Sequence, residues 1–491
     1  MISVVTSPVK KATQKQGKMD FQLKQGMHIH LVGVGGAGIS AIARVLLGRG
    51  FKVSGSDQQR NELTDALTAE GATIYIGHDR AHVAGADALV ISSAVPADNP
   101  EVVAAQEAGI PVLKRASFLG HLMAEQIGIA VAGSHGKTTT TGMIAQILLA
   151  ADLDPSVIVG GVLPSLGVNG RYGEGDFFVI EADEYDHMFL GLRPEVIVVT
   201  NIEHDHPDLF PTEADYLAAF RQFVSLLPEG GRLIACADDP GVRKLLRGLR
   251  VPGVEITTYS VGEGSQEPRP ADFQAFDCRP NQLGGTDFVV EEAGQAIGLA
   301  RIRVPGIHNV RNALAAIIVA LDLGVDFPVV CQGLAEFGGM GRRFQIVGEV
   351  GGVTVIDDYA HHPTEIRATL AAAKERFPGR RLWAVWQPHT FSRTRLLQKE
   401  FANSFADADR VIALDIYRSR EKESLGMDTA VVVAAMNHPH AIHIPGQEEA
   451  VQYLLDRIHP DDVVLTLSAG DGNQVGYQLL TKLRQRIEPR R

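Results

Sequence analysis

The sequence predicts an α/β protein of three domains: a Rossmann-like N-terminal domain, a central domain with a phosphate-binding loop, and a Rossmann-like C-terminal domain. The length of 491 residues exceeds one ordinary core and corresponds to roughly three domains. From His28 onward, short apolar strands alternate with helix-like segments, which is typical of parallel sheets with crossover helices. Two glycine-rich turns each join a strand to a helix. We expect a flexible leader over residues 1–26 and domains over 27–123, 124–337 and 338–491.

The first glycine turn follows the predicted strand His28–Val32 and precedes a predicted helix over 39–47. Asp57 lies 19 residues beyond its last glycine, a spacing that fits the dinucleotide fingerprint, in which the acid binds a ribose hydroxyl. The same turn could bind the pyrophosphate of another nucleotide, such as a UDP-sugar. The residues favour NAD(P) and another nucleotide equally as the ligand, and a turn with a purely structural role is the third alternative. The glycines are Gly33, Gly35, Gly36 and Gly38.

A nicotinamide-dependent oxidoreductase is therefore a rival hypothesis. Two observations weaken it, because no hydride-transfer site is evident elsewhere and because a second phosphate loop follows that a dehydrogenase would not need. Further strands are predicted over 52–54 and 88–92, so the ligand should lie at the carboxyl ends of this sheet.

The second glycine turn, Gly133–Thr141, lies between the apolar run Ile127–Ala132 and a helix-like segment over 143–149. It predicts ATP binding, because backbone N–H groups at a helix N-terminus hold phosphate, a lysine neutralises it and a threonine hydroxyl holds Mg²⁺. The loop is shorter than the general motif, which places glycine where Val131 stands. The alternative is an ordinary strand-to-helix turn. The candidate ATP-binding residues here are Gly133, Ser134, His135, Gly136, Lys137, Thr138 and Thr139.

Polar clusters follow the next two predicted strands of the central domain, 177–180 and 196–200. We expect Glu181 and His206, at these strand ends, to complete a Mg²⁺ shell with Thr138, since Mg²⁺ usually takes only one or two carboxylates. The neighbouring polar residues are expected to be solvated in loops: Asp183, Glu184, His204 and Asp205. The glycine- and proline-rich stretch Gly262–Gly285 is predicted to be a surface insertion.

Asn309 and Asn312 are expected on one face of a helix, where they need a partner such as a base edge, a backbone carbonyl or water. The alternative for Asn309 is helix capping. The C-terminal domain is predicted to be doubly wound, with strands over 353–356, 382–386, 410–414 and 463–467. Arg343 at its start and Asp358 after its first strand would face the ATP.

Composition narrows the class of protein. The net charge of −12 argues against non-specific nucleic-acid binding. Three scattered cysteines indicate neither a zinc site nor a disulfide framework, so a reducing cytoplasm is expected. No uncharged apolar segment approaches the ~20 residues that span a bilayer, so no membrane insertion is expected. The oligomeric state, monomer or homodimer, is left open.

The sequence resembles the Mur ligases of peptidoglycan synthesis from about His28 to the C-terminus. Many ordered motifs over three domains carry the resemblance, which makes it specific although each motif alone is weak. They are His30–Ser40, Gly133–Thr141, Glu181–Glu184, Asn201–His206, His308–Ala313, Gly341–Phe344, Asp357–Thr364, Gln387–His389 and Ala469–Asp471.

The resemblance implies ATP-dependent ligation of L-alanine to the lactyl carboxylate of UDP-N-acetylmuramate through an acyl phosphate, with ATP and Mg²⁺ as cofactors. It favours the UDP-sugar for the first glycine turn, where Ser40, Asp57, Ser92 and Ser93 would assist. In the ATP site it implies roles for Lys137, Glu181, His206, Arg343 and Asp358, with Asn309 and Asn312 in the nucleotide region. His389 and Arg393 would line the amino-acid site.

Two positions depart from the family pattern. Ala360 stands where the related motif has glycine, and Thr390 stands where many relatives have arginine after Gln387–His389. The second departure removes a cation near the expected amino-acid site, which bears on the preferred amino acid.

Overall fold

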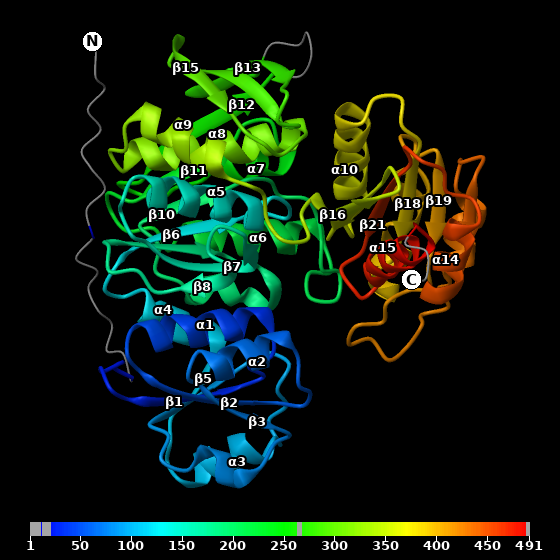
Figure 1. Cartoon of the computed structure of the whole chain (residues 1–491). Helices are drawn as coiled ribbons and strands as arrows, with labels where there is room; N and C mark the ends of the chain where they lie inside the picture. The colour runs from blue at the N-terminus through cyan, green and yellow to red at the C-terminus, as the bar shows by residue number, and fades with distance from the viewer. Residues whose placement is uncertain (1–10, 12–20, 263–267, 488–491) are drawn as a thin grey trace.

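The structure, a computed structural model, describes residue 11 and residues 21–262 and 268–487. Three α/β units, each built on its own sheet, confirm the predicted fold class. In Figure 1 the N-terminal unit (blue) lies below the central unit (cyan to green), and the C-terminal unit (yellow to red) lies beside the central one.

The N-terminal unit has a five-stranded parallel sheet in the order β3-β2-β1-β4-β5. The central strand β1 is buried along its whole length, and the apolar stripe of α1 covers it. Asn61 and Asn99 cap the helices α2 and α3 through their side-chain oxygens. The elements are β1 (His28–Val32), α1 (Ala37–Gly48), β2 (Lys52–Asp57), α2 (Glu62–Ala69), β3 (Thr73–Ile76), η1 (Arg80–Val83), β4 (Ala88–Ile91), α3 (Pro100–Glu107), β5 (Val112–Lys114) and α4 (Arg115–Leu122).

The central unit has a ten-stranded sheet in the order β15-β14-β13-β12-β11-β10-β6-β9-β7-β8. The middle strands are parallel, whereas β8 and the β13–β15 meander pair antiparallel. Apolar residues of α5, α8 and α9 form one core with the sheet. The strands are β6 (Ile127–Ala132), β7 (Ser156–Leu163), β8 (Val168–Arg171), β9 (Phe177–Glu181), β10 (Val196–Val199), β11 (Arg232–Cys236), β12 (Glu255–Val261), β13 (Phe273–Pro280), β14 (Thr286–Glu292) and β15 (Gln295–Arg301). The helices are α5 (Lys137–Ala150), η2 (Tyr185–Gly191), α6 (Glu213–Val224), α7 (Pro240–Leu246), α8 (Ile307–Asp322) and α9 (Phe327–Glu336).

The C-terminal unit has a six-stranded sheet in the order β16-β17-β21-β18-β19-β20, parallel except for β16. Both faces are covered, as two separate apolar clusters show. The strands are β16 (Gln345–Val350), β17 (Val353–Asp358), β18 (Leu382–Trp386), β19 (Arg410–Ala413), β20 (Ala441–His443) and β21 (Val463–Leu467). The helices are α10 (Pro363–Arg376), α11 (Phe391–Leu396), α12 (Gln398–Ala402), α13 (Thr429–Ala435), α14 (Gln447–Leu455) and α15 (Gln474–Ile487).

Two sequence expectations need correction. The stretch Gly262–Gly285 is not wholly a surface insertion, because its described part contains β13, whose alternate residues Phe273 and Ala275 are buried in the sheet. Most of the leader predicted over residues 1–26 lies outside the described residues. However, Phe21 is 7% exposed and meets His121 edge-on, so the last part of the predicted leader packs on the fold.

The N-terminal and central units are docked through α1 and β8. The Nδ2 of Asn169 donates to the Ala37 carbonyl at 2.8 Å, and Arg44 donates to the Asn169 side-chain oxygen at 2.5 Å. A Cβ on Gly170 would lie 2.7 Å from the Ala41 backbone, so only glycine permits this close approach. The relative position of the two units is therefore fixed by specific contacts.

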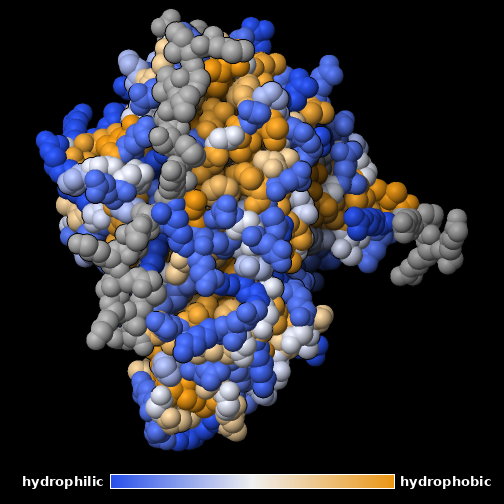
Figure 2. Space-filling view, turned by 90° about the vertical axis from the view of Figure 1, so that its left-hand side faces the viewer, coloured by the Kyte–Doolittle hydropathy of each residue, from blue (hydrophilic) through white to orange (hydrophobic). Residues whose placement is uncertain are grey.

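The surface mixes polar and apolar residues. On the side shown in Figure 2, apolar residues gather in the upper part beside the grey trace, and polar residues cover much of the middle. Among the described residues, no helix combines the length and the apolar character that crossing a membrane requires.

Candidate active site

The phosphate loop is a left-handed turn between β6 and α5. Gly133 and Gly136 have φ values of +143° and +82°. A Cβ on Gly133 would lie 2.0 Å from the Thr200 hydroxyl oxygen, and one on Gly136 would lie 2.5 Å from Oδ1 of Asn312. Backbone conformation and space therefore both demand glycine at these two positions. The amides at the start of α5 have no side-chain cap, which leaves the helix N-terminus available to an anion.

Lys137, the first residue of α5, is held by a carboxylate that we expected to be solvated. The Lys137 Nζ lies 2.8 Å from Oε2 of Glu184, which is only 1% exposed. The hydroxyl of Tyr216 donates to the other carboxylate oxygen at 3.0 Å. Against burial, the charges of Lys137 and His206 lower the pKa of Glu184 to about 2. The expectation of a solvated Glu184 is therefore wrong, because cations from two other segments neutralise it inside the fold.

The expected Mg²⁺ ligands fall into two neighbouring groups. The Thr138 hydroxyl donates to Oε1 of Glu181 at 3.0 Å, and the Gly160 N–H donates to Oε2 at 2.7 Å. Nε2 of His206 instead faces Glu184, at 3.6 Å from Oε1. A hydroxyl and a half-buried carboxylate side by side are hard oxygen donors that suit Mg²⁺. The residues therefore fit the ion, with Thr138 and Glu181 forming the most compact pair.

A cavity of about 340 Å³ opens beside the phosphate loop, between the central and C-terminal units. Eight of the expected nucleotide residues line it: His135, Gly136, Thr138, Thr139, Asn309, Asn312, Arg343 and Asp358. Gly133, Ser134 and Lys137, of the same loop, are not among the residues that line it. Tyr259 and Asp238, which no motif indicates, also line the cavity, and so does His308, which opens the motif His308–Ala313 but was assigned no role. Both units therefore contribute to one site of a size suited to a small ligand.

The paired asparagines lie on one face of α8, as expected. Nδ2 of Asn312 donates to Oδ1 of Asn309 at 3.1 Å, and Nδ2 of Asn309 donates to the Pro305 carbonyl at 2.7 Å. The helix begins at Ile307, so Asn309 lies inside the helix rather than at its cap. The asparagines satisfy one another and present a polar edge to the cavity.

From the C-terminal unit, Asp358 and Arg343 complete the opposite wall. Asp358 accepts hydrogen bonds from the Phe344 and Ala360 amides, both at 2.7 Å, and burial raises its pKa to about 6. Arg343 lies 3.5 Å from Oε1 of Glu365. The two expected residues are thus both held in place at the cavity.

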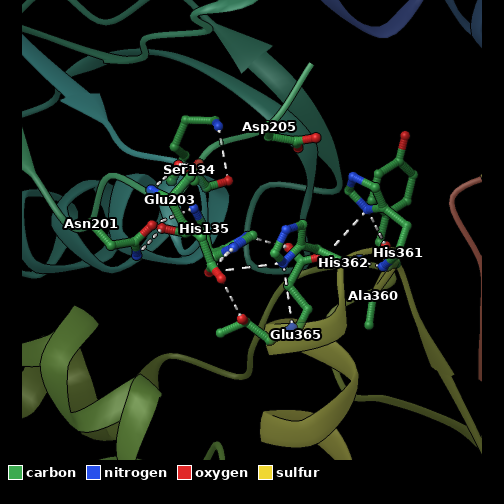
Figure 3. A network of polar contacts seen from close by, with 12 residues as sticks. Ser134, His135, Asn201, Glu203, Asp205, Ala360, His361, His362 and Glu365 are labelled. Atoms are coloured by element: carbon green, nitrogen blue, oxygen red, sulfur yellow. Dashed lines mark hydrogen bonds and ion pairs between the residues drawn. The ribbon is translucent and has the colours of Figure 1, made fainter. Parts of the chain in front are cut away.

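A polar network joins the phosphate loop to the C-terminal unit, and Figure 3 shows its members converging from both sides. His135 lies 3.1 Å from Oε2 of Glu203 through Nε2 and 3.2 Å from Oε1 of Glu365 through Nδ1. The Thr364 hydroxyl donates to Oε1 of Glu203 at 2.9 Å. Against burial, the charges of Glu365 and Glu203 raise the pKa of His135 to about 9. A cationic His135 therefore lies between two carboxylates, one from each unit.

A second link between the units is the buried pair of Asp205 and Arg393. Nε and Nη2 of the guanidinium donate to the two carboxylate oxygens at 2.8 and 3.1 Å. Asp205 is 4% exposed, so the expectation that it is solvated is wrong, because α11 covers the loop. Arg393 also donates to the His389 carbonyl at 2.9 Å, which brings the two expected amino-acid residues together. Asp183 and His204 remain partly exposed, although Asp183 pairs with Arg115 at 3.5 Å.

In the N-terminal unit, the first glycine turn contacts only some of the residues expected around it. Oδ2 of Asp57 accepts from the Gly35 amide at 2.9 Å, and a Cβ on Gly33 would lie 3.1 Å from Cβ of Ser92. Ser93 is exposed beside Ser92. Ser40, in contrast, lies at the interface with the central unit, where it accepts from Asn169 at 3.2 Å.

A cation that no motif indicated, Arg115, lies beside this turn. A Cβ on Gly38 would lie 2.0 Å from Nη1 of Arg115, and the other end of that guanidinium reaches Asp183 in the central unit. Arg115 therefore lies between the first glycine turn and Asp183, which follows strand β9 of the central unit. No motif marks it, since it is brought there only by the docking of the two units.

The fold and these sites define a three-domain α/β nucleotide-binding enzyme whose phosphate loop is completed by its C-terminal domain. Residues 28–127 match the Mur ligase family, catalytic domain, residues 131–320 the Mur ligase middle domain, and residues 342–470 the Mur ligase, glutamate ligase domain. The chain belongs to the Mur ligase family, which confirms the resemblance drawn from its motifs.

Several known proteins are similar over nearly the full chain. UDP-N-acetylmuramate–L-alanine ligase of Geotalea uraniireducens is 46% identical over 460 residues, covering 93% of this chain and 98% of that one. The protein of the same name from a Roseiflexus species is 45% identical over 472 residues, covering 94% and 100%. Among solved structures, UDP-N-acetylmuramate-alanine ligase from Thermotoga maritima matches with a TM-score of 0.77 and 28% identity, covering 94% and 100%. A murein peptide ligase from Psychrobacter arcticus has a TM-score of 0.70 and 28% identity, covering 93% and 99%.

Proposed function

We propose that this chain ligates L-alanine to the lactyl carboxylate of UDP-N-acetylmuramate, with ATP converted to ADP and phosphate. The observation that carries the proposal is the shared cavity, where a phosphate loop meets Arg343 and Asp358 from the C-terminal unit. Relatives that match nearly the whole chain bear the name of this activity. The reaction supplies a precursor for peptidoglycan.

The chemistry explains why ATP is needed. Near neutral pH the lactyl group is a carboxylate and alanine is an ammonium ion, so direct amide formation meets two unreactive charges. Transfer of the γ-phosphoryl group to the carboxylate gives an acyl phosphate, in which phosphate is a good leaving group. The deprotonated amine then attacks the acyl carbon, and the tetrahedral intermediate expels phosphate. The protein contributes mainly positioning and neutralisation of charge.

Each domain has a proposed role in this reaction. Residues 27–123 bind the UDP-sugar through Gly33–Gly38, with Asp57, Ser92 and Ser93 nearby. Residues 124–337 bind ATP, and residues 338–491 admit the amino acid and close on the nucleotide. Arg115 is well placed to neutralise the negative charge that lies between the two glycine turns.

In the ATP site we assign Lys137 to the β- and γ-phosphates, a role that requires it to leave Glu184 when the nucleotide binds. Thr138 and Glu181, with His206, would hold Mg²⁺, which when bound neutralises charge on the phosphates. Asp358 takes the ribose and Arg343 the transferred phosphoryl group. Glu184 keeps Lys137 and His206 close to each other between turnovers.

The test is phosphate release from ATP by the purified full-length chain. We expect release only when UDP-N-acetylmuramate and L-alanine are both present, with the amide product detected by mass spectrometry. Robust release with a dipeptide or tripeptide acceptor and none with L-alanine would instead assign a peptide ligase activity. Hydride transfer to or from NAD(P) would replace the proposal with an oxidoreductase.

A further inference from the structure

The guanidinium of Arg393, a residue that the family resemblance places in the amino-acid site, is already fully engaged. Two of its nitrogens bind Asp205 in a bidentate pair, and the third donates to the carbonyl of His389. Arg393 is 4% exposed. A substrate carboxylate could bind here only by breaking a buried ion pair, which is strongly unfavourable. Arg393 is therefore better suited to hold α11 and His389 against the central unit.

A second arginine lies beside the same segment. Glu421 accepts hydrogen bonds from the amides of Phe391 and Ser392 at 2.6 and 3.2 Å, and so binds the free N-terminus of α11. This contact fixes the loop that carries Arg420 next to Thr390, the position that lacks a cation. Burial, together with the charges of Arg393 and Arg420, lowers the pKa of His389 to about 4.

Arg420 is exposed and has its donors available. Its guanidinium carbon lies 4.0 Å from the ring centroid of Tyr185, a residue of the central unit. Within the described part of the chain, no carboxylate lies within ion-pair distance of Arg420. Stacking on an aromatic face orients a guanidinium while leaving its N–H edge free to bind a carboxylate in a bidentate manner.

The position of Arg420 relative to the ATP site is also suitable. The Tyr185 hydroxyl donates to Asp208 at 3.1 Å, and the Tyr185 ring meets the His206 ring edge-on with centroids 5.0 Å apart. Arg420 is thus separated from a proposed Mg²⁺ ligand by one aromatic ring. A carboxylate bound to Arg420 would lie at the boundary between the two units, close to where the acyl phosphate is formed.

We propose that Arg420 binds the carboxylate of the incoming amino acid and takes the place of the cation absent at Thr390, whereas Arg393 is a positioning residue. The inference rests on the proposed ligase function and deepens it. Arg420 would select a free α-amino acid as the substrate class, because an amide or ester in place of the carboxylate would offer no negative charge to the guanidinium.

The test compares L-alanine with L-alaninamide, which lacks the carboxylate, in wild type and Arg420→Ala. We expect the KM for L-alanine to rise about 10- to 100-fold in the variant, as for loss of a charged hydrogen bond. The KM for L-alaninamide, ATP and UDP-N-acetylmuramate should stay within about twofold. Arg420→Lys should show a smaller rise in the KM for L-alanine, because lysine keeps the positive charge but cannot bind a carboxylate in a bidentate manner.

Arg418→Ala is the matched control, since it removes an exposed arginine of the same loop whose guanidinium carbon is 6.0 Å from the Phe391 ring centroid. It should leave the KM for L-alanine unchanged. Equal effects of Arg420→Ala on L-alanine and L-alaninamide, or no effect on either, would overturn the inference while the ligase function stands. A wild-type protein that forms no product with L-alanine would instead overturn the proposed function itself.

Discussion

Replacing His135 by glutamine tests whether a cationic imidazole joins the phosphate loop to the C-terminal unit. His135 lies between Glu203 and Glu365, with the His362 ring centroid 4.7 Å away. The side chains of His135 and Glu365 are 13% and 11% exposed, so solvent screens this pair only weakly, whereas Glu203 is 41% exposed and its charge is screened more strongly. Glutamine keeps a similar size and can still donate a hydrogen bond, but it carries no charge.

The size of the expected destabilisation follows from the raised pKa of the His135 imidazole. Against the opposing effect of burial, the two carboxylates raise the pKa of His135 from its ordinary 6.5 to about 9. That difference corresponds to about 3 kcal/mol of stabilisation of the charged form in the folded state. Because the folded-state pKa is the higher one, the stabilisation is complete below about pH 6.5. It is lost as the pH rises through about 9.

The assay is urea unfolding followed by far-UV circular dichroism at pH 6 and pH 10. At pH 6 we expect His135→Gln to lose about 3 kcal/mol relative to wild type, and at pH 10 the two proteins should differ by less than about 1 kcal/mol. His440→Gln, at an exposed histidine, is the matched control and should match wild type at both pH values. A destabilisation of equal size at both pH values would refute the reasoning.

Three further predictions concern the same region. Lys137→Ala should retain UDP-N-acetylmuramate binding in calorimetry but lose at least about 10³-fold in turnover, because the phosphoryl transition state loses its neutralising cation; near-normal turnover would exclude Lys137 from the mechanism. Gly136→Ala should raise the KM for ATP and lower the thermal midpoint, because the new Cβ would meet Asn312 at 2.5 Å with a φ of +82°; an unchanged KM would contradict this. Asp205→Asn should expand the protein in small-angle X-ray scattering, because Arg393 loses its buried partner and the units separate; an unchanged radius of gyration would argue that the pair does not hold them together.

The local features of the fold could be predicted from the sequence. The strand–turn–helix at Gly133–Gly136 is specified by neighbouring residues, namely an apolar strand, glycines that tolerate positive φ and a helix start. The strand β1 was likewise predicted with its observed bounds, His28–Val32, because a short apolar run leads directly into glycines. The family motifs allowed roles to be predicted for further residues, whose functions the local sequence does not indicate.

The parts that could not be predicted depend on distant segments. Glu184 and Asp205 follow strands, as solvated loop residues often do, yet each is buried because a cation arrives from elsewhere in the chain. Arg393 is 188 residues from Asp205, so nothing in either local sequence indicates the pair. The glycine- and proline-rich composition around β13 likewise indicates turns and conceals a strand whose pairing depends on β12 and β14.

The position of His135 within the phosphate loop itself has a thermodynamic consequence. His135 belongs to the loop that we propose binds ATP, and the same side chain contacts Glu365 of the C-terminal unit. Nucleotide binding and domain docking would therefore act on the same few atoms. By reciprocity, if ATP changes the equilibrium between open and closed arrangements by some factor, closing must change the affinity for ATP by the same factor. Any ligand that closes the C-terminal unit, the amino acid included, will then alter ATP affinity without touching the nucleotide.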